Sequence, residues 1–412
     1  MDSTIMADTF KATKISDNVY WVGAIDWDLR NFHGYLTSRG TTYNAYLILG
    51  SEPILVDTVR APFYGEMIER IRSVIDPTRI RHVISCHAEM DHSGALPRLL
   101  QEITPTSVIA STPGAKALRE HFHWDREVQE VKTGERLELG DRFLRFVETR
   151  MLHWPDSMFA FLEGDDVLFS NDAFGMHVAG SERFADELPD DLLRHEAAKY
   201  YGNILMPFSR LVQRLTDQLP GMGLPIQVIA PDHGPLWRRD TDRILDWYAR
   251  WARRETRNKA VVIYDSMWKS TTLMARAIGE GLSLGGTEPR LMSLDGSHRS
   301  DVATEVLEAA GLLVGSPTMN GQLYPTIADA MTYLKGLRPA NLLGGAFGSY
   351  GWSGEAVPQI EAILTNEMKA RLPAPGVRVR YVPTDEDLAT CREMGAAMSA
   401  AIHENRKDGE DR

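Results

Sequence analysis

The sequence contains little cysteine, with only Cys86 and Cys391 among 412 residues. Two cysteines cannot form a disulfide framework, and no Cys-x-x-Cys pair is present. Rubredoxin-like and iron–sulfur modules hold their iron on paired cysteine thiolates, so these residues include no such module. Cys86 stands directly before a histidine, but we expect a small buried residue at a strand end rather than a metal ligand. If the protein performs redox chemistry, its electrons must come from a separate partner.

Long apolar segments and an excess of positive charge are also missing. No apolar run approaches the roughly 18 residues that span a bilayer, and the N-terminus shows no charged head followed by an apolar stretch. The formal net charge of −12 argues against nucleic-acid binding, which requires a basic face. We therefore expect a soluble, cytoplasmic protein with neither a membrane nor a nucleic-acid partner.

A dense group of potential metal ligands stands between Ser85 and Gly94, directly after the strand-like run Val83-Ile84. Imidazoles and carboxylates so closely spaced converge when the backbone curls around a common centre, and this mixture suits Fe, Mn or Zn. The four candidate ligands in this loop are His87, Glu89, Asp91 and His92.

Three further candidates follow apolar runs or turn signals later in the chain, namely His153, Asp172 and His233. The seven side chains suffice for two metals. We expect one metal to be bound by His87, Glu89 and His153, the other by Asp91, His92 and His233, and Asp172 to bridge them. The three carboxylates and one bridging hydroxide would balance two Fe(II) ions, and a neutral cluster can be buried.

The loop resembles the metal loop of the metallo-β-lactamase superfamily, His-x-His-x-Asp-His, except that Glu89 replaces the second histidine. A negatively charged, hard oxygen donor favours iron over zinc. Together with His153, Asp172 and His233 at their separations, the pattern resembles the di-iron site of the flavodiiron proteins, also called A-type flavoproteins. Segments 28–35 and 41–48 resemble this family too, and the resemblance covers nearly the whole chain.

The second half of the chain carries three loops that predict a flavin site. A hydroxyl-rich turn follows the strand-like run Lys259–Tyr264 and precedes a helical pattern, so free N–H groups at the helix start can bind phosphate. Two later loops also follow apolar strands, and in a doubly wound sheet such loops meet at one edge. No Gly-x-Gly-x-x-Gly fingerprint is present, which favours FMN over NAD or FAD. The expected FMN contacts are Ser266, Met267, Trp268, Lys269, Ser270, Thr271, Ser316, Pro317, Thr318, Met319, Asn320, Ser349, Tyr350, Gly351, Trp352, Ser353 and Gly354, with Tyr350 and Trp352 stacked on the ring.

The length is typical of two to three domains, and the motifs fit two. The resemblance implies an α/β protein with a metallo-β-lactamase-like αββα sandwich over residues 1–255 and a flavodoxin-like, doubly wound parallel sheet over residues 256–402. The boundary is placed where the helix-like segment 241–253 runs into a charged stretch. Residues 403–412 are polar throughout, and we expect a disordered tail.

The resemblance also implies a function. FMN would take electrons from a rubredoxin-like or similar donor protein and pass them to two iron ions that reduce O₂ to water, NO to N₂O, or both; the sequence leaves this choice open. A head-to-tail homodimer, or a dimer of dimers, would bring the flavin of one subunit beside the irons of the other. Two alternatives remain open: a zinc-dependent hydrolase of the metallo-β-lactamase type with a fused flavodoxin, and a non-catalytic redox sensor.

The remaining histidines need separate assignments. We expect His33 and His177 to be candidates for the walls of the metal pocket, and His82 to be structural. The others lie in polar or amphipathic helical contexts typical of surface or packing positions: His121, His123, His195, His298 and His403.

Overall fold

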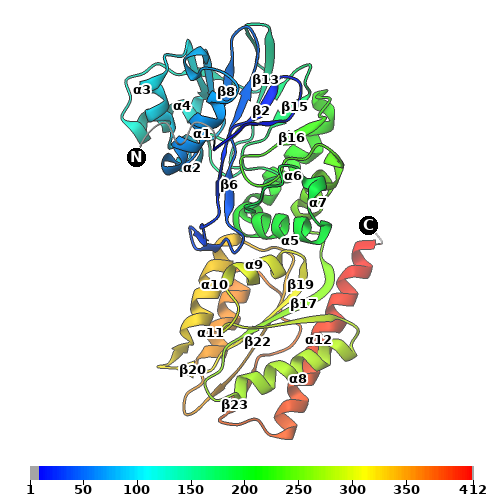
Figure 1. Cartoon of the computed structure of the whole chain (residues 1–412). Helices are drawn as coiled ribbons and strands as arrows, with labels where there is room; N and C mark the ends of the chain where they lie inside the picture. Colours follow the sequence, from blue (N-terminus) through cyan, green and yellow to red (C-terminus); the bar gives the residue numbers. More distant parts are fainter. Residues whose placement is uncertain (1–8, 411–412) are drawn as a thin grey trace. The chain divides into compact units, whose positions relative to one another are not determined.

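The computed structural model describes residues 9–410 (Figure 1). The chain divides into two compact units, of which the second begins at Arg250 and also includes the short segments Gly34–Leu36 and Tyr201–Ser209. The first strand of the second unit, β17 (Arg257–Tyr264), starts at residue 257. We therefore keep 1–255 and 256–402 as the proposed domain limits.

The first unit contains two large sheets. In the seven-stranded sheet the four last strands are parallel, and the order is β1 (Thr13–Lys14), β2 (Val19–Trp21), β7 (Tyr46–Ile48), β8 (Ile54–Val56), β9 (His82–Ser85), β10 (Ser107–Ser111), β11 (Gln129–Val131). The five-stranded sheet is antiparallel except for its last pair, in the order β12 (Arg136–Leu139), β13 (Arg142–Glu148), β14 (Met158–Leu162), β15 (Val167–Phe169), β16 (Val228–Ala230). The short strands β3 (Ala24–Asp26) and β6 (Thr41–Tyr43) form a separate pair.

The two sheets pack face to face and enclose one apolar core. Trp21, Tyr46 and Ile84 from the first sheet lie in the same buried cluster as Phe146 and Phe169 from the second. A second cluster joins the outer face of the first sheet to α1 (Tyr64–Arg72), α3 (Leu96–Glu102) and α4 (Thr112–Phe122). On the other side, α6 (Ser209–Gln218) and α7 (Thr241–Ala252) lie near β16, and α5 (Asp190–Tyr200) lies lower in the view (Figure 1). The four layers confirm the expected αββα sandwich.

The second unit is built on a five-stranded, all-parallel sheet in the order β18 (Glu288–Ser293), β17, β19 (Ala309–Gly315), β22 (Leu343–Tyr350), β23 (Val377–Arg380). Helices α8 (Ser270–Leu284) and α12 (Asp385–Glu410) cover one face, and α9 (Arg299–Leu307), α10 (Pro325–Leu337) and α11 (Ala356–Ala362) lie on the other (Figure 1). Buried on both faces, the central strands are continuously apolar. The strand order reverses between β17 and β19, which is where doubly wound sheets bind ligands.

The end of the chain corrects the expectation of a disordered tail. Helix α12 continues to Glu410, so residues 403–410 are helical, and 411–412 lie outside the described residues. The helix is held here because Ile402 is fully buried and His403 Nε2 lies 3.1 Å from the carbonyl oxygen of Gly285. A polar sequence alone did not reveal this anchoring.

Within the part of the chain that the structure describes, no helix combines the length and apolar character needed to cross a bilayer.

Candidate metal centre and flavin site

The seven predicted metal ligands lie where strands end and loops begin. His87 and Glu89 follow β9, and Asp91 and His92 belong to the short helix α2 (Met90–Ser93). Asp172 follows β15, and His233 follows β16. Because β15 and β16 run parallel, with Phe169 opposite Ala230, their following residues emerge at the same edge of the sheet. The remaining ligand candidate, His153, lies in the loop between β13 and β14.

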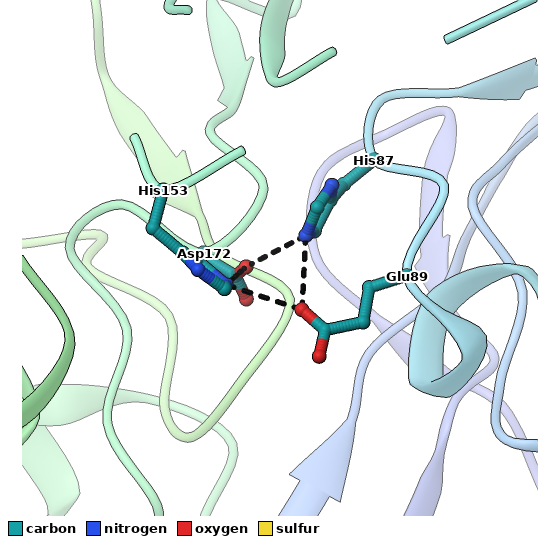
Figure 2. Close-up of side chains that lie close together, drawn as sticks. All are labelled: His87, Glu89, His153 and Asp172. Atoms are coloured by element: carbon teal, nitrogen blue, oxygen red, sulfur yellow. Dashed lines mark hydrogen bonds and ion pairs between the residues drawn. The ribbon is translucent and has the colours of Figure 1, made fainter. Parts of the chain in front are cut away.

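One group forms around Glu89 and Asp172 (Figure 2). His87 Nε2 and His153 Nε2 each lie 3.2 Å from Glu89 Oε2. The same two nitrogen atoms lie 3.4 and 3.1 Å from Asp172 Oδ2. Two imidazoles and two carboxylates thus point at one small volume.

The second group uses the other oxygen of Asp172. Asp172 Oδ1 lies 3.2 Å from His92 Nε2 and 3.4 Å from His233 Nε2. Asp91 faces the same two imidazoles, with Oδ1 3.4 Å from His92 and Oδ2 3.3 Å from His233. The structure therefore brings all seven predicted residues together, and Asp172 presents one oxygen to each group.

These residues fit a pair of metal ions. His87, Glu89, His153 and Asp172 each offer one ligand atom within 4.8 Å of the others, and so do Asp91, His92 and His233. Among the described residues, neither oxygen of Asp91 or Asp172 has a hydrogen-bond partner, and neither has Nε2 of His92, although all are buried. A buried polar atom without a partner costs about 1–3 kcal/mol, and cations at the two centres would remove this cost. Mixed imidazole and carboxylate ligands suit iron, manganese or zinc.

The charges within the group favour ionised carboxylates. Burial by itself would raise the pKa of Asp172, but the neighbouring imidazoles of His92 and His153 outweigh this effect and hold the pKa well below its usual value. Asp172 is thus poised to coordinate as a carboxylate, which metal binding requires.

Oxygen atoms that face Nδ1 of His87, His92 and His233, on the side away from the proposed metals, orient the three rings. His87 Nδ1 donates to Asp156 Oδ2 at 3.0 Å, and His233 Nδ1 donates to the carbonyl oxygen of Thr42 at 2.7 Å. Asp232 Oδ2 lies 3.5 Å from His92 Nδ1. Each contact directs Nε2 toward the centre, as in most protein metal sites. Asp156 and Asp232 were not among the predicted site residues, although the first follows His153 by three positions and the second directly precedes His233.

A cavity of about 700 Å³ opens over the metal-ligand group. Its lining includes Leu29, Asn31, Phe32, His33, Arg60, Glu89, Met90, Asp91, His121, His153 and Trp154. His33 Nε2 lies 3.2 Å from Glu89 Oε1, which places it in the pocket where we expected it.

The other histidines are distributed differently. His177 is buried behind the site, with its ring 4.7 Å from that of His233 and Nδ1 2.8 Å from Thr41 Oγ1. His82 lies 2.7 Å from Glu52 Oε2 and 2.9 Å from Ser107 Oγ, which suits the structural role we expected. His121 was assigned to the surface or to packing; its exposed side chain also lines the metal cavity.

A second cavity, of about 670 Å³, lies at the carboxyl edge of the sheet in the second unit. Eleven of the predicted FMN contacts line it: Met267, Trp268, Ser270, Pro317, Thr318, Asn320, Ser349, Tyr350, Gly351, Trp352 and Ser353. Trp268 and Trp352 are 90% and 87% exposed, so their rings are accessible to a planar ligand.

Six predicted contacts do not line this cavity: Ser266, Lys269, Thr271, Ser316, Met319 and Gly354. Thr271 and Ser316 are buried, and their hydroxyls bond to Ser349 Oγ and to the carbonyl oxygen of Pro317. Three lining residues were missed, namely Gly321, Tyr381 and Val382. The last two follow β23, a strand that the sequence analysis did not connect with the three loops.

The start of α8 can receive a phosphate. Lys269 is its N-cap residue, has a left-handed backbone (φ 70°) and forms no side-chain cap hydrogen bond. The hydroxyl of Ser266 is buried and, within residues 9–410, has no hydrogen-bond partner. Unsatisfied N–H groups and the positive end of the helix dipole favour an anion at this position. These residues therefore fit a flavin mononucleotide.

Comparison with known proteins agrees with this geometry. Residues 41–234 match the model of the ODP family beta lactamase, and residues 262–395 match that of flavodoxin. A nitric oxide reductase of Moorella thermoacetica is 45% identical, over 94% of this chain and 98% of its own. A rubredoxin-oxygen oxidoreductase of Megalodesulfovibrio gigas is 43% identical, over 95% of this chain and 98% of its own.

Solved structures give the same result. The rubredoxin oxygen:oxidoreductase from Desulfovibrio gigas superimposes with a TM-score of 0.93 at 42% identity, covering 95% of this chain and 99% of that one. The flavodiiron protein from Giardia intestinalis reaches a TM-score of 0.90 at 30% identity, covering 96% and 97%. With its metallo-β-lactamase-like first domain and flavodoxin-like second domain, the chain belongs to the flavodiiron protein family.

Proposed function

We propose that the protein is a flavodiiron oxidoreductase that takes electrons from a rubredoxin-type donor and reduces O₂ to water, NO to N₂O, or both. The observation that carries this proposal is the position of Asp172, whose two carboxylate oxygens face two separate groups of histidines. Such an arrangement fits two metal ions that share one bridging ligand. Relatives named nitric oxide reductase and rubredoxin-oxygen oxidoreductase support the two candidate substrates and the donor.

The proposed iron ligands are those predicted from the sequence. His87, Glu89 and His153 would hold one iron, Asp91, His92 and His233 the other, and Asp172 would bridge them. FMN would occupy the cavity of about 670 Å³ in the second unit. When bound, these groups supply the redox chemistry that no side chain can provide, electron acceptance by FMN and reduction of the gas at the iron pair.

The chain itself contributes position, charge and exclusion of water. The outer hydrogen bonds of His87 and His233 fix which ring nitrogen faces the metals. Apolar side chains of Phe32, Met90 and Trp154 line the cavity through which a small diatomic molecule would enter. In the flavin cavity, the aromatic rings of Tyr350 and Trp352 would pack against the isoalloxazine.

We further propose the head-to-tail homodimer, or a dimer of dimers, that the family resemblance implies. The exposed rings of Trp268 and Trp352 at the flavin cavity would be covered in such an assembly. The flavin of one subunit would then serve the irons of the other.

Glu89 argues against the zinc hydrolase, because its hard carboxylate oxygen stands where zinc enzymes of that superfamily use an imidazole. A non-catalytic redox sensor would not require an open cavity of about 700 Å³ over the metals.

Metal analysis and a visible spectrum of the purified protein, followed by gas consumption with a reduced rubredoxin as donor, test the proposal. About two irons per chain, a flavin spectrum and consumption of O₂ or NO are expected. Zinc without iron would contradict it, and so would a fully loaded protein that consumes neither gas.

A further inference from the structure

The metal cavity contains one histidine, His121, that contacts none of the proposed ligand carboxylates. It lies in the last turn of α4, is exposed to solvent, and lines the same cavity as Glu89 and His153. The side chain therefore lies on a path between bulk water and the metal site.

A hydrogen bond fixes the orientation of the His121 ring. Its Nδ1 lies 3.0 Å from the carbonyl oxygen of Ala88, and because a carbonyl only accepts, Nδ1 carries the proton. The ring also lies edge-on to Trp154, with centroids 6.1 Å apart. Within the described residues Nε2 forms no hydrogen bond with the protein, so Nε2 is the atom that can take up and release a proton.

The other titratable groups of the cavity are committed elsewhere. Glu89, Asp91 and His153 are proposed iron ligands, and His33 donates to Glu89 Oε1. The guanidinium of Arg60 only donates hydrogen bonds. His121 is thus the titratable histidine of this lining that contacts no proposed iron ligand.

We propose that His121 relays protons from solvent into the metal cavity through Nε2. This rests on the proposed function, in which reduction of one O₂ to two water molecules consumes four electrons and four protons, and reduction of two NO to N₂O and water consumes two of each. The electrons come from the donor protein by way of the flavin. Each proton leaves Nε2 for water in the cavity, and a proton from bulk water replaces it, so His121 is unchanged after each turnover.

The test compares His121→Ala with the control His123→Ala, which removes an exposed histidine two positions away that does not line the cavity. With iron and FMN content equal to wild type, His121→Ala should lose about tenfold or more of its turnover. Imidazole added to the buffer should restore turnover in this variant and leave the control unaffected. His121→Asn, whose amide can still donate to Ala88 but cannot carry a proton, should show the same loss.

A measurement that does not depend on turnover is the modification of the resting protein by diethyl pyrocarbonate, followed by peptide mass spectrometry. His121 should react much faster than His82, because both ring nitrogens of His82 are hydrogen-bonded. Unchanged turnover in both His121 variants, a loss that imidazole does not restore, or an unreactive His121 would overturn the relay alone. A loaded wild type that consumes neither gas would overturn the proposed function and the relay together.

Discussion

Asp156 Oδ2 accepts two hydrogen bonds from neighbouring residues, one from His87 Nδ1 at 3.0 Å and one from the backbone N–H of Ala88 at 2.6 Å. Asp156 therefore fixes both the ring of a proposed iron ligand and the backbone that follows it. Burial would raise the pKa of Asp156, but the hydrogen bond from His87 lowers it. The carboxylate is thus ionised at neutral pH and acts as a permanent acceptor.

Replacing Asp156 with alanine should weaken iron binding by about 10- to 100-fold, because the His87 ring would lose its orientation. Competition with a chelator, followed by iron analysis, measures the effect. The control Asp17→Ala removes a carboxylate that is 95% exposed and should retain iron. Equal iron affinity in both variants would show that Asp156 does not orient the ligand.

Asp172→Ala should lose most of the iron and all gas consumption while FMN binding persists. Loss of this side chain removes one oxygen from each ligand group, whereas the flavin cavity lies in the other unit. Iron analysis, the flavin spectrum and a gas-consumption assay measure these properties, with the exposed Asp125→Ala as the control. An Asp172→Ala protein with full iron and normal turnover would contradict the assignment of the bridge.

Trp352→Ala should lower the affinity for FMN by about threefold to tenfold, because an aromatic stacking contact contributes roughly 0.5–1.5 kcal/mol. Titration of the flavin-free protein with FMN, followed by quenching of flavin fluorescence, measures this change. The matched control is Trp27→Ala, which removes another exposed tryptophan, 55% exposed, in the first unit. An unchanged affinity would place the flavin ring away from Trp352.

Subunit mixing tests the proposed dimer. His87→Ala disables the metal site, and Ser270→Asp puts a carboxylate at the start of α8, where it would repel the flavin phosphate. Each variant should be inactive alone, and their mixture should recover roughly a quarter of wild-type turnover if subunits reassort at random and act independently. No activity in a verified heterodimer would mean that electrons pass within one chain.

Arg136 and Arg145 both hydrogen-bond to Glu163, so the stability of the folded protein should depend on the ionisation of this carboxylate and therefore on pH. Hydrogen bonds from Arg136 and from Arg145 lower the pKa of Glu163 to about 2. Burial opposes this shift, but its effect is smaller than that of Arg136. A lowered pKa in the folded state means that the stabilisation is complete above the unfolded value, about 4.3, and is lost as the pH falls toward 2. Glu163→Gln should therefore be less stable than wild type at pH 6, by about 1 kcal/mol or less for this surface cluster, and equal to it near pH 2.

Urea unfolding of the metal-free protein at several pH values measures this difference. Glu127→Gln, which changes an exposed glutamate outside the cluster, serves as the control. A stability difference between wild type and Glu163→Gln that does not change with pH would rule out the ion pairs as its source.

The sequence indicates the proposed metal ligands because their residue types and spacing are local features. His87, Glu89, Asp91 and His92 occupy six positions, and the later ligands follow strand-like runs that end at the same edge. The outer partners could not be found in this way. Nothing in the sequence indicates that Asp156 would accept from a histidine 69 positions earlier, because that pairing depends on how β9 and the β13–β14 loop meet.

Three other features also depend on contacts between distant segments, which the sequence pattern does not reveal. His121 lies on an amphipathic helix, and only the fold of the first unit shows that the last turn of α4 reaches the metal cavity. Tyr381 enters the flavin cavity because β23 pairs with β22, and no motif in the sequence marks that neighbour. The helix over residues 403–410 depends on anchoring at Gly285, more than a hundred positions earlier in the chain.

The proposed metal ligands come from both sheets of the sandwich: His87 follows a strand of the seven-stranded sheet, while Asp172 and His233 follow strands of the five-stranded sheet. Ions bound there would link the two sheets to each other. Because the metal ions would bind only when both sheets are in place, the free energy of ion binding adds to the stability of the folded sandwich. Iron supply would then set the lifetime of the protein as well as its activity, since a chain without iron opens, and meets proteases, more often than a loaded one.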